Sequence, residues 1–225
     1  SVTVIIASVK VSSLIYLNKK RKLPLVNLLV NLTILFSEIL KLLLNQATVP
    51  KYLKMSTQPI KKFTADSLPV LVFETENDMA TNVAHTVHDY LVATINQQGQ
   101  AAAILATGNS QIQFLQKLAD LGGIDWSKMT LFHMDEYLGV DENHPACFRR
   151  YMRERVESRV KPKAFHYLGG DAPEPIAECE RYESLLKNHS IDLCCMGVGE
   201  NGHIAFNDPP VADFEDDRLV KIVEL

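Results

Sequence analysis

The segment AAAILATGNSQIQFLQKLADL, residues 101–121, carries the pattern that indicates the fold. A short apolar run comes first, a polar turn with one glycine follows, and apolar residues then recur every three or four positions. Such a run is typical of a strand that is buried on both faces, and the later spacing predicts an amphipathic helix. The segment therefore predicts one strand–turn–helix unit of an α/β protein.

The same alternation continues on both sides of this unit. Besides residues 102–106, strands are expected at residues 70–73, 129–133, 164–168, 191–197 and 219–223. Helices are expected at residues 78–96, 110–121, 145–160 and 175–189. This order predicts a three-layer α/β fold with a mainly parallel, Rossmann-like sheet and helices on both faces. In such sheets ligands bind beyond the carboxyl ends of the strands, so functional residues are expected in the turns that follow them.

The composition is that of a globular protein, with 47% hydrophobic and 22% charged residues among 225. A net charge of −4 gives no overall basic surface for nucleic acid. The four cysteines lack the spacing of a disulfide scaffold or a zinc site, and no histidine–carboxylate spacing predicts a metal site. Nucleic-acid binding, metal binding and a disulfide framework are therefore not expected.

The charge is distributed unevenly along the chain. Residues 1–54 carry eight basic residues and one acid, a charge of +7, whereas residues 55–225 carry 15 basic residues and 26 acids, a charge of −11. Apolar runs at residues 2–17 and 25–44 flank the basic cluster at residues 18–22. The first part is interpreted as a signal anchor or an interfacial helix, or as a stretch foreign to the natural protein. A membrane partner is expected only if residues 1–54 are genuine.

The first turn of interest is ATGNSQ, residues 106–111. Gly108 permits close approach to the backbone, while Thr107, Asn109 and Ser110 supply hydroxyl and amide groups. Free amides at the start of the following helix would form an anion site. The alternative is an ordinary turn in which Ser110 is the helix N-cap.

The second turn is FHMDEYLG, residues 132–139. Asp135 and Glu136 follow a strand end, where a carboxylate can act as a general base and remove a proton next to a carbonyl. The alternative is a pair of acids that only caps or solvates the loop.

The third turn is MGVGENGHIAFNDPP, residues 196–210, in which three glycines surround polar residues that include His203 and Asp208. An imidazole held by a carboxylate can change its charge near neutral pH. The turn contains a GxGxxG pattern, but no clear helix follows, so no dinucleotide-binding site is expected.

The three turns together resemble the glucosamine-6-phosphate deaminase/isomerase family and its 6-phosphogluconolactonase relatives. The resemblance covers the chain from about residue 69 onward and rests on MDEYLG, on His144–Pro145 followed by Phe148, and on GxGxxGHIAFN. It implies ring opening and enolisation of an amino-sugar 6-phosphate, with conversion of glucosamine 6-phosphate to fructose 6-phosphate and ammonia. It further implies a cytoplasmic enzyme without a cofactor, with a small-molecule sugar phosphate as ligand, which could form a homo-oligomer.

The resemblance also implies roles for single residues. Asp135 would move the proton, His203 would act on the ring oxygen, and Asp208 would orient His203. Asn201 stands where the best-known deaminases have an aspartate, which predicts a weaker histidine base. The phosphate would lie on Thr107, Gly108, Asn109 and Ser110, and further substrate contacts would come from Glu136 and Gly202.

Family members continue beyond the residue that matches Leu225, so the last part of the fold is expected to be missing from this chain. Two other functions stay open at this point. One is the hydrolysis of a sugar lactone 6-phosphate, as in the 6-phosphogluconolactonases. The other is sugar-phosphate binding without catalysis, or an inactive truncated product.

Overall fold

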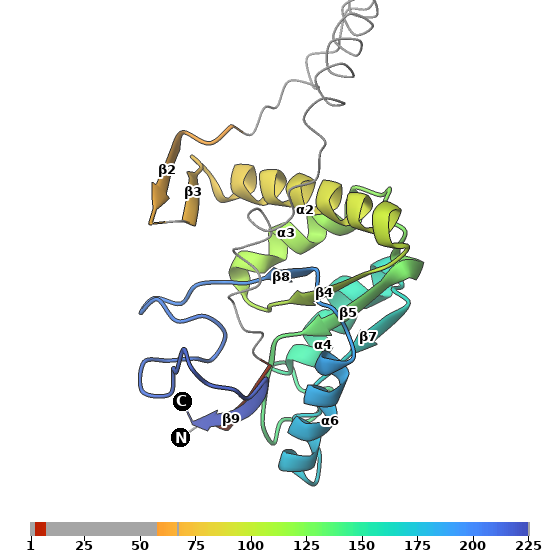
Figure 1. Ribbon diagram of the computed structural model, residues 1–225, viewed down its shortest axis with the longest axis vertical. Helices are drawn as coiled ribbons and strands as arrows, with labels where there is room; N and C mark the ends of the chain where they lie inside the picture. The colour runs from red at the N-terminus through yellow and green to blue at the C-terminus, as the bar shows by residue number, and fades with distance from the viewer. Residues whose placement is uncertain (1–2, 8–57, 67, 225) are drawn as a thin grey trace, which may run out of the picture.

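The computed structural model describes residues 3–7, 58–66 and 68–224 (Figure 1). The strands are β1 (Thr3–Ala7), β2 (Lys61–Ala65), β3 (Leu68–Val72), β4 (Ala101–Leu105), β5 (Met129–His133), β6 (Asp135–Tyr137), β7 (Ala164–His166), β8 (Leu193–Cys195) and β9 (Val220–Glu224). The longer helices are α2 (Glu76–Gln98), α3 (Asn109–Asp120) and α6 (Pro175–Lys187). Shorter helical pieces are a 3-10 turn (Trp126–Lys128), α4 (Phe148–Met152), a π-helical turn (Arg153–Glu157) and α5 (Ser158–Val160).

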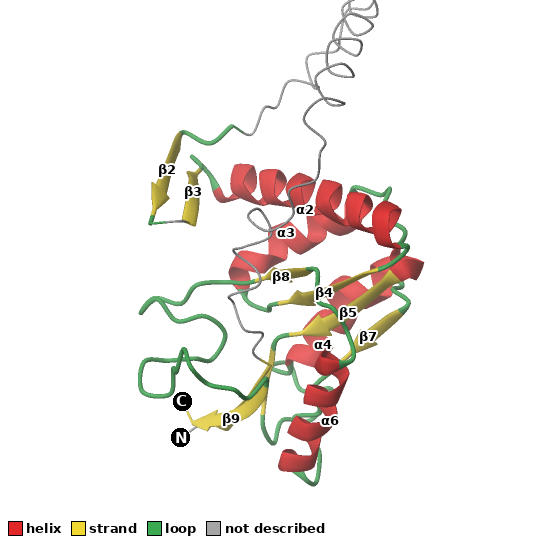
Figure 2. Cartoon of the chain, in the orientation of Figure 1, coloured by secondary structure: helices red, strands yellow, loops and turns green. Residues whose placement is uncertain are grey.

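The centre of the described part is a four-stranded parallel sheet in the order β7-β5-β4-β8 (Figure 2). Every residue of β4 and β5 is buried. Helices cover both faces of these strands, which explains why their sequences are short continuous apolar runs. The mainly parallel α/β sheet predicted from the sequence is thus confirmed.

Helices form a layer on each face of this sheet. α2, α3 and the α4–α5 stretch pack on one face, where Leu91, Phe114 and Leu131 share a core. α6 packs on the other face, where Tyr182 and Phe132 share a second core. Successive strand residues point to opposite faces, so Leu131 and Phe132 of β5 belong to different cores. The arrangement has the three layers that the sequence predicted.

The helix boundaries follow local capping. The side chain of Thr75 accepts a hydrogen bond from Asp78 N at 3.1 Å at the start of α2, and Gly99 ends this helix with a φ of 79°. The helix at residues 145–160 differs from the prediction in where it begins and in being interrupted. It begins only at Phe148, after Pro145, and a π-helical turn divides α4 from α5.

Two smaller sheets depart from the prediction. The strand expected at residues 70–73 is β3, which pairs antiparallel with β2 in a hairpin instead of joining the parallel sheet. The short connection makes this local pairing inexpensive in chain entropy. The strand expected at residues 219–223 is β9, which lies in an antiparallel sheet of the order β6-β1-β9.

β1 comes from residues 1–54, which were predicted from the sequence to be a separate extension. It lies between β6 and β9, so these five residues pair with strands of the second part. The apolar run at residues 25–44, interpreted as a possible anchor, lies outside the described residues, and the boundary after residue 54 stays a prediction. Within the described ranges, no helix combines the length and the apolar character needed to cross a membrane.

Candidate active site

The turn between β4 and α3 is open at the carboxyl end of β4. Gly108 is the N-cap of α3 with a φ of 111°, a conformation that favours glycine, and Gly108, Asn109 and Ser110 are exposed. In the described part of the chain, no side chain caps α3, so Ser110 is not the N-cap. The hydroxyl of Tyr151 donates to Gly108 O at 3.1 Å and ties the turn to the α4–α5 side.

The loop after β8 begins beside this turn. A Cβ atom at Gly197 would lie 3.5 Å from Ser110 Oγ, which measures how close the two loops are. The amide of Ala106 donates to Cys195 O at 3.0 Å just before both loops begin. The first and third turns found in the sequence therefore meet at one edge of the sheet, as parallel strands require.

Asp135 begins β6, directly after the end of β5. Its side chain is only 6% exposed, and its Oδ1 atom is buried without a hydrogen-bond partner among the described residues. Burial is the main cause that raises the pKa of Asp135 to about 7, and the charge of Glu136 adds to it. A carboxyl group with such a pKa can both take and return a proton near neutral pH.

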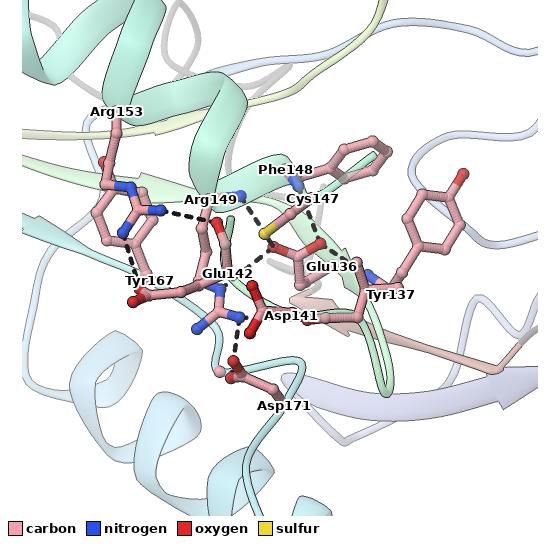
Figure 3. Close-up of polar contacts among 12 residues, drawn as sticks. Glu136, Tyr137, Asp141, Glu142, Cys147, Phe148, Arg149, Arg153, Tyr167 and Asp171 are labelled. Carbon is pink, nitrogen blue, oxygen red and sulfur yellow. Dashed lines mark hydrogen bonds and ion pairs between the residues drawn. The ribbon is translucent and has the colours of Figure 1, made fainter. Parts of the chain in front are cut away.

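Glu136 takes a different position from the one expected (Figure 3). It is 0% exposed, and its carboxylate accepts hydrogen bonds from the amides of Tyr137, Phe148 and Arg149 and from Cys147 Sγ. Both oxygens are thus committed to the protein. The prediction of Glu136 as a substrate-binding residue does not fit this structure, because its carboxylate is turned toward the start of α4.

His203, Asn201 and Asp208 lie together in the loop after β8. His203 Nδ1 lies 3.0 Å from Asp208 Oδ1, outside hydrogen-bond alignment. Asn201 Nδ2 donates to the same Asp208 oxygen at 2.7 Å, and Asn201 Oδ1 accepts from the backbone amide of His203 at 3.1 Å. Asn201 therefore holds the carboxylate that faces the imidazole, a role that the sequence did not predict.

Two glycines shape this loop. The backbone of Gly199 lies so close to His203 that a Cβ atom there would overlap the imidazole ring. Gly202, a predicted substrate contact, has a φ of 86° and donates its amide to Gly199 O at 2.9 Å. The glycines allow the chain to turn back on the histidine.

An open pocket of about 540 Å³ lies beside these residues. Its lining consists of Asn201, His203, Phe206, Asp208, Pro209, Pro210, Val211 and Glu224. Neither Asp135 nor the residues from Thr107 to Ser110 contribute to this lining. The structure thus brings the predicted residues to the same part of the sheet without placing all of them in one pocket.

Three aromatic rings connect the second and third turns. Tyr137 lies with its ring centroid 4.9 Å from that of Phe148 and 5.4 Å from that of Phe206, and the last two rings are stacked at 6.0 Å. These residues link β6, the start of α4 and the histidine loop. Tyr137 lies inside the MDEYLG motif and Phe206 inside the HIAFN motif, but the sequence predicted no role for either residue.

The described residues contain no group of three or more histidine, cysteine or acidic side chains that could hold a metal ion. Their polar side chains instead combine a buried carboxyl group, a histidine–carboxylate pair and an open helix start. With the three-layer sheet, this set defines a Rossmann-like α/β protein with a candidate site for acid–base chemistry.

The chain belongs to the glucosamine-6-phosphate isomerase/6-phosphogluconolactonase family, whose model matches residues 74–224. The resemblance inferred from the three turns is therefore confirmed.

Curated relatives carry the name of one branch of this family. The chain is 38% identical over 143 residues to a glucosamine-6-phosphate deaminase of Exiguobacterium sp., covering 64% of this chain and 54% of the relative. It is 37% identical over 137 residues to glucosamine-6-phosphate deaminase 2 of Bacillus subtilis, covering 58% and 55%. The chain spans about half the length of the curated relatives it matches.

Solved structures show the same fold. A monomeric glucosamine-6-phosphate deaminase is similar with a TM-score of 0.55 and 27% identity, over 60% of this chain and 57% of that chain. A 6-phosphogluconolactonase from Shewanella baltica is similar with a TM-score of 0.56 and 23% identity, over 61% and 59%. The second likeness is one of fold alone.

Proposed function

We propose that this protein converts glucosamine 6-phosphate to fructose 6-phosphate and ammonia. The observation that carries the proposal is Asp135, a buried carboxyl group with a pKa raised to about 7, at the end of a strand of the sheet. The curated relatives named glucosamine-6-phosphate deaminases support the choice of reaction.

The proposed reaction begins with opening of the sugar ring, in which His203 acts on the ring oxygen. Asp208 Oδ1 lies 3.0 Å from His203 Nδ1, and Asn201 holds Asp208 in place. This arrangement supports proton transfer to and from an oxygen at the pocket that these residues line.

The open-chain sugar then isomerises. Asp135 removes the proton from carbon 2 and returns it to carbon 1, so the same carboxyl group acts as base and then as acid. The nitrogen on carbon 2 becomes an imine, which water hydrolyses to a ketone with release of ammonia. Every step moves protons or water, so the reaction calls for no electron carrier.

The phosphate group is proposed to bind at the turn formed by Thr107, Gly108, Asn109 and Ser110. The turn is open, and the backbone amides at the start of α3 favour an anion. The ligand class is thus a sugar phosphate. A cytoplasmic location is proposed with it, because phosphorylated sugars are kept inside cells, and a homo-oligomer stays a prediction.

The test is to incubate the full chain with glucosamine 6-phosphate and to measure both ammonia and fructose 6-phosphate. The Asp135→Asn variant should lose at least about a hundredfold in rate, because it cannot exchange the proton. Asp89→Asn is the matched control, since this aspartate is 80% exposed on α2 and should leave the rate unchanged.

Other outcomes would replace the proposal. Hydrolysis of 6-phosphogluconolactone without release of ammonia would assign the chain to the lactonase reaction. Binding of glucosamine 6-phosphate without any product would favour the non-catalytic interpretation. Equal rates for Asp135→Asn and the native chain would show that Asp135 is not the proton carrier.

A further inference from the structure

Glu136 is a buried acid that the proposed reaction does not use directly. It follows Asp135 in β6, and adjacent residues of a strand point to opposite faces of the sheet. Two acids are therefore buried next to each other along the chain while their side chains meet different surroundings. Burial of a second charge beside the proposed base needs a reason, since it is costly unless the charge is well bound.

The contacts of Glu136 fix the start of α4. Its Oε1 atom accepts from the amides of Tyr137 and Phe148, both at 3.0 Å. Its Oε2 atom accepts from the amide of Arg149 at 2.9 Å and from Cys147 Sγ at 3.2 Å. A carboxylate at a helix start is also favoured by the helix dipole. One side chain thus joins β6 to the first turn of α4 (Figure 3).

The loop at Gly170 and Asp171 packs against the junction between β6 and α4. Arg149 Nε lies 3.6 Å from Glu136 Oε2, and Arg149 Nη2 contacts Asp171 Oδ1 at 2.9 Å. A Cβ atom at Gly170 would overlap Tyr137 O and would lie 2.8 Å from Glu136 Cγ. The chain around Gly170 therefore packs directly against Glu136, and Arg149 partly balances the charge of Glu136.

Besides Glu136, Asp135 interacts electrostatically with titratable groups of β8, α6 and β6. From β8, Cys194 has its pKa raised to about 12, mainly by burial and also by Asp135. From α6, Tyr182 has a pKa well above its usual value, mainly by burial, with a smaller contribution from Asp135. Burial and the two acids likewise raise the pKa of Tyr137. These three groups become negatively charged only well above pH 7, and the charge that raises the pKa of Asp135 is that of Glu136.

We propose that Glu136 is a positioning residue for the proposed reaction, which anchors β6 to the start of α4 and keeps a fixed negative charge beside Asp135. This role rests on the proposed function, in which Asp135 moves the proton. The carboxylate makes the neighbouring carboxyl easier to protonate, as a nearby like charge does.

The test follows the titration of Asp135 in the full chain without substrate, by NMR of ¹³C-labelled aspartate carboxyl groups, with Asp135→Asn to assign the signal. In Glu136→Gln the titration should move about one pH unit lower, because the charge is gone and the size is kept. In Glu136→Asp, which keeps the charge, and in Cys147→Ala, which removes a neutral partner, it should stay in place.

Arg149→Met provides a second measurement if Glu136→Gln does not fold. Loss of the cation leaves the charge of Glu136 unbalanced, so Asp135 should titrate at higher pH, opposite to the effect of Glu136→Gln. Unchanged titration of Asp135 in every folded variant would overturn the charge effect and leave Glu136 a purely structural residue.

Kinetics separate this proposal from the proposed function. With glucosamine 6-phosphate, Glu136→Gln should move the acidic limb of kcat/KM to lower pH and lower kcat about tenfold, whereas Glu136→Asp should retain the limb. If the native chain releases no ammonia, the proposed function fails, even where the titration of Asp135 responds to Glu136. If ammonia is released but the limb does not move, only the role of Glu136 fails.

Discussion

The parallel sheet and the antiparallel sheet β6-β1-β9 differ in the kind of side chain that they bury. β4 and β5 of the parallel sheet are buried at every position, and apolar side chains dominate both of their cores. The antiparallel sheet buries charged side chains, namely Asp135, Glu136 and Lys221. Apolar burial stabilises the first sheet without further conditions, whereas each charge in the second must be bound by particular partners. The difference separates the part that holds the fold from the part that carries the proposed chemistry.

Two histidines show the same contrast. His133 ends β5 and is 0% exposed, with neither ring nitrogen bonded to a described residue. Burial, with a smaller effect of Arg149, lowers its pKa to about 3, so this imidazole is neutral near pH 7. His203 has a side chain 27% exposed and faces Asp208 in the loop after β8. Only the second histidine has the surroundings that proton transfer requires.

The largest expected effect tests the parallel sheet. Leu131→Ala should lower the free energy of unfolding by about 2 to 5 kcal/mol, because it leaves a cavity in a core where Leu131 is 1% exposed. Urea denaturation measures this loss. Product formation per folded molecule should stay unchanged, since Leu131 belongs to the apolar core that α2 and α3 cover.

Leu71→Ala is the matched control for this loss. Leu71 is 47% exposed on β3, so its truncation should change the free energy of unfolding by less than about 0.5 kcal/mol. Equal losses for the two variants would show that the described core does not hold the fold.

The second prediction concerns the buried charge of Asp135. Its folded pKa of about 7 lies above the unfolded value of about 4, so the folded chain holds the proton more tightly in this range. Stability should therefore fall as the pH rises from about 4 to 7, by on the order of 2 to 4 kcal/mol. In Asp135→Asn this loss should disappear, as urea denaturation at pH 5 and pH 8 would measure.

Asp216 provides a comparison of opposite sign. Arg218, followed by Lys221, holds the pKa of Asp216 well below its usual range. Its contribution to stability is present above the unfolded pKa of about 4 and is lost as the pH falls further. Asp216→Asn should thus destabilise the chain at pH 7, where Asp135→Asn stabilises it. Two variants with the same response to pH would contradict the assigned environments.

A small effect on stability is expected at Gly199. The Gly199→Ala methyl group would overlap the His203 ring and should push it away from Asp208. We expect a loss of about tenfold in product formation, with less than about 1 kcal/mol in the free energy of unfolding. Enzyme assays and urea denaturation on the same preparation measure both quantities.

Gly122→Ala controls for the effect of lost stability on activity in this experiment. Gly122 has a φ of 67°, but a Cβ atom there meets nothing within 4 Å. It should lose stability comparable to that of Gly199→Ala while keeping its activity. An equal loss of activity at both glycines would remove the special role of the ring contact.

Local patterns predicted the parallel sheet well. The strand expected at residues 129–133 is β5, because its apolar run has polar residues at both ends. β6 was not predicted, since it has only three residues, two of them acids. Its partner β1 lies in a distant part of the chain, and no local pattern reveals such a pairing.

The candidate site was predicted in part for the same reason. His203 and Asp208 were expected together and face each other at 3.0 Å, because a short loop joins them. The family resemblance implied a substrate contact for Glu136, but strand geometry turns its side chain to the face opposite that of Asp135. The partners of Glu136 at residues 147–149 depend on tertiary packing, which the order of residue types alone does not contain.

The position of β1 also sets an order of assembly during translation. Residues 3–7 are synthesised before the strands of the parallel sheet, whereas their partners in β9, residues 220–224, are synthesised after those strands. All strands of the parallel sheet precede β9 along the chain, so that sheet can form before β1 meets its partner β9. Pairing across so long a separation in sequence is slow. The nascent chain therefore acquires its scaffold first and its candidate site last.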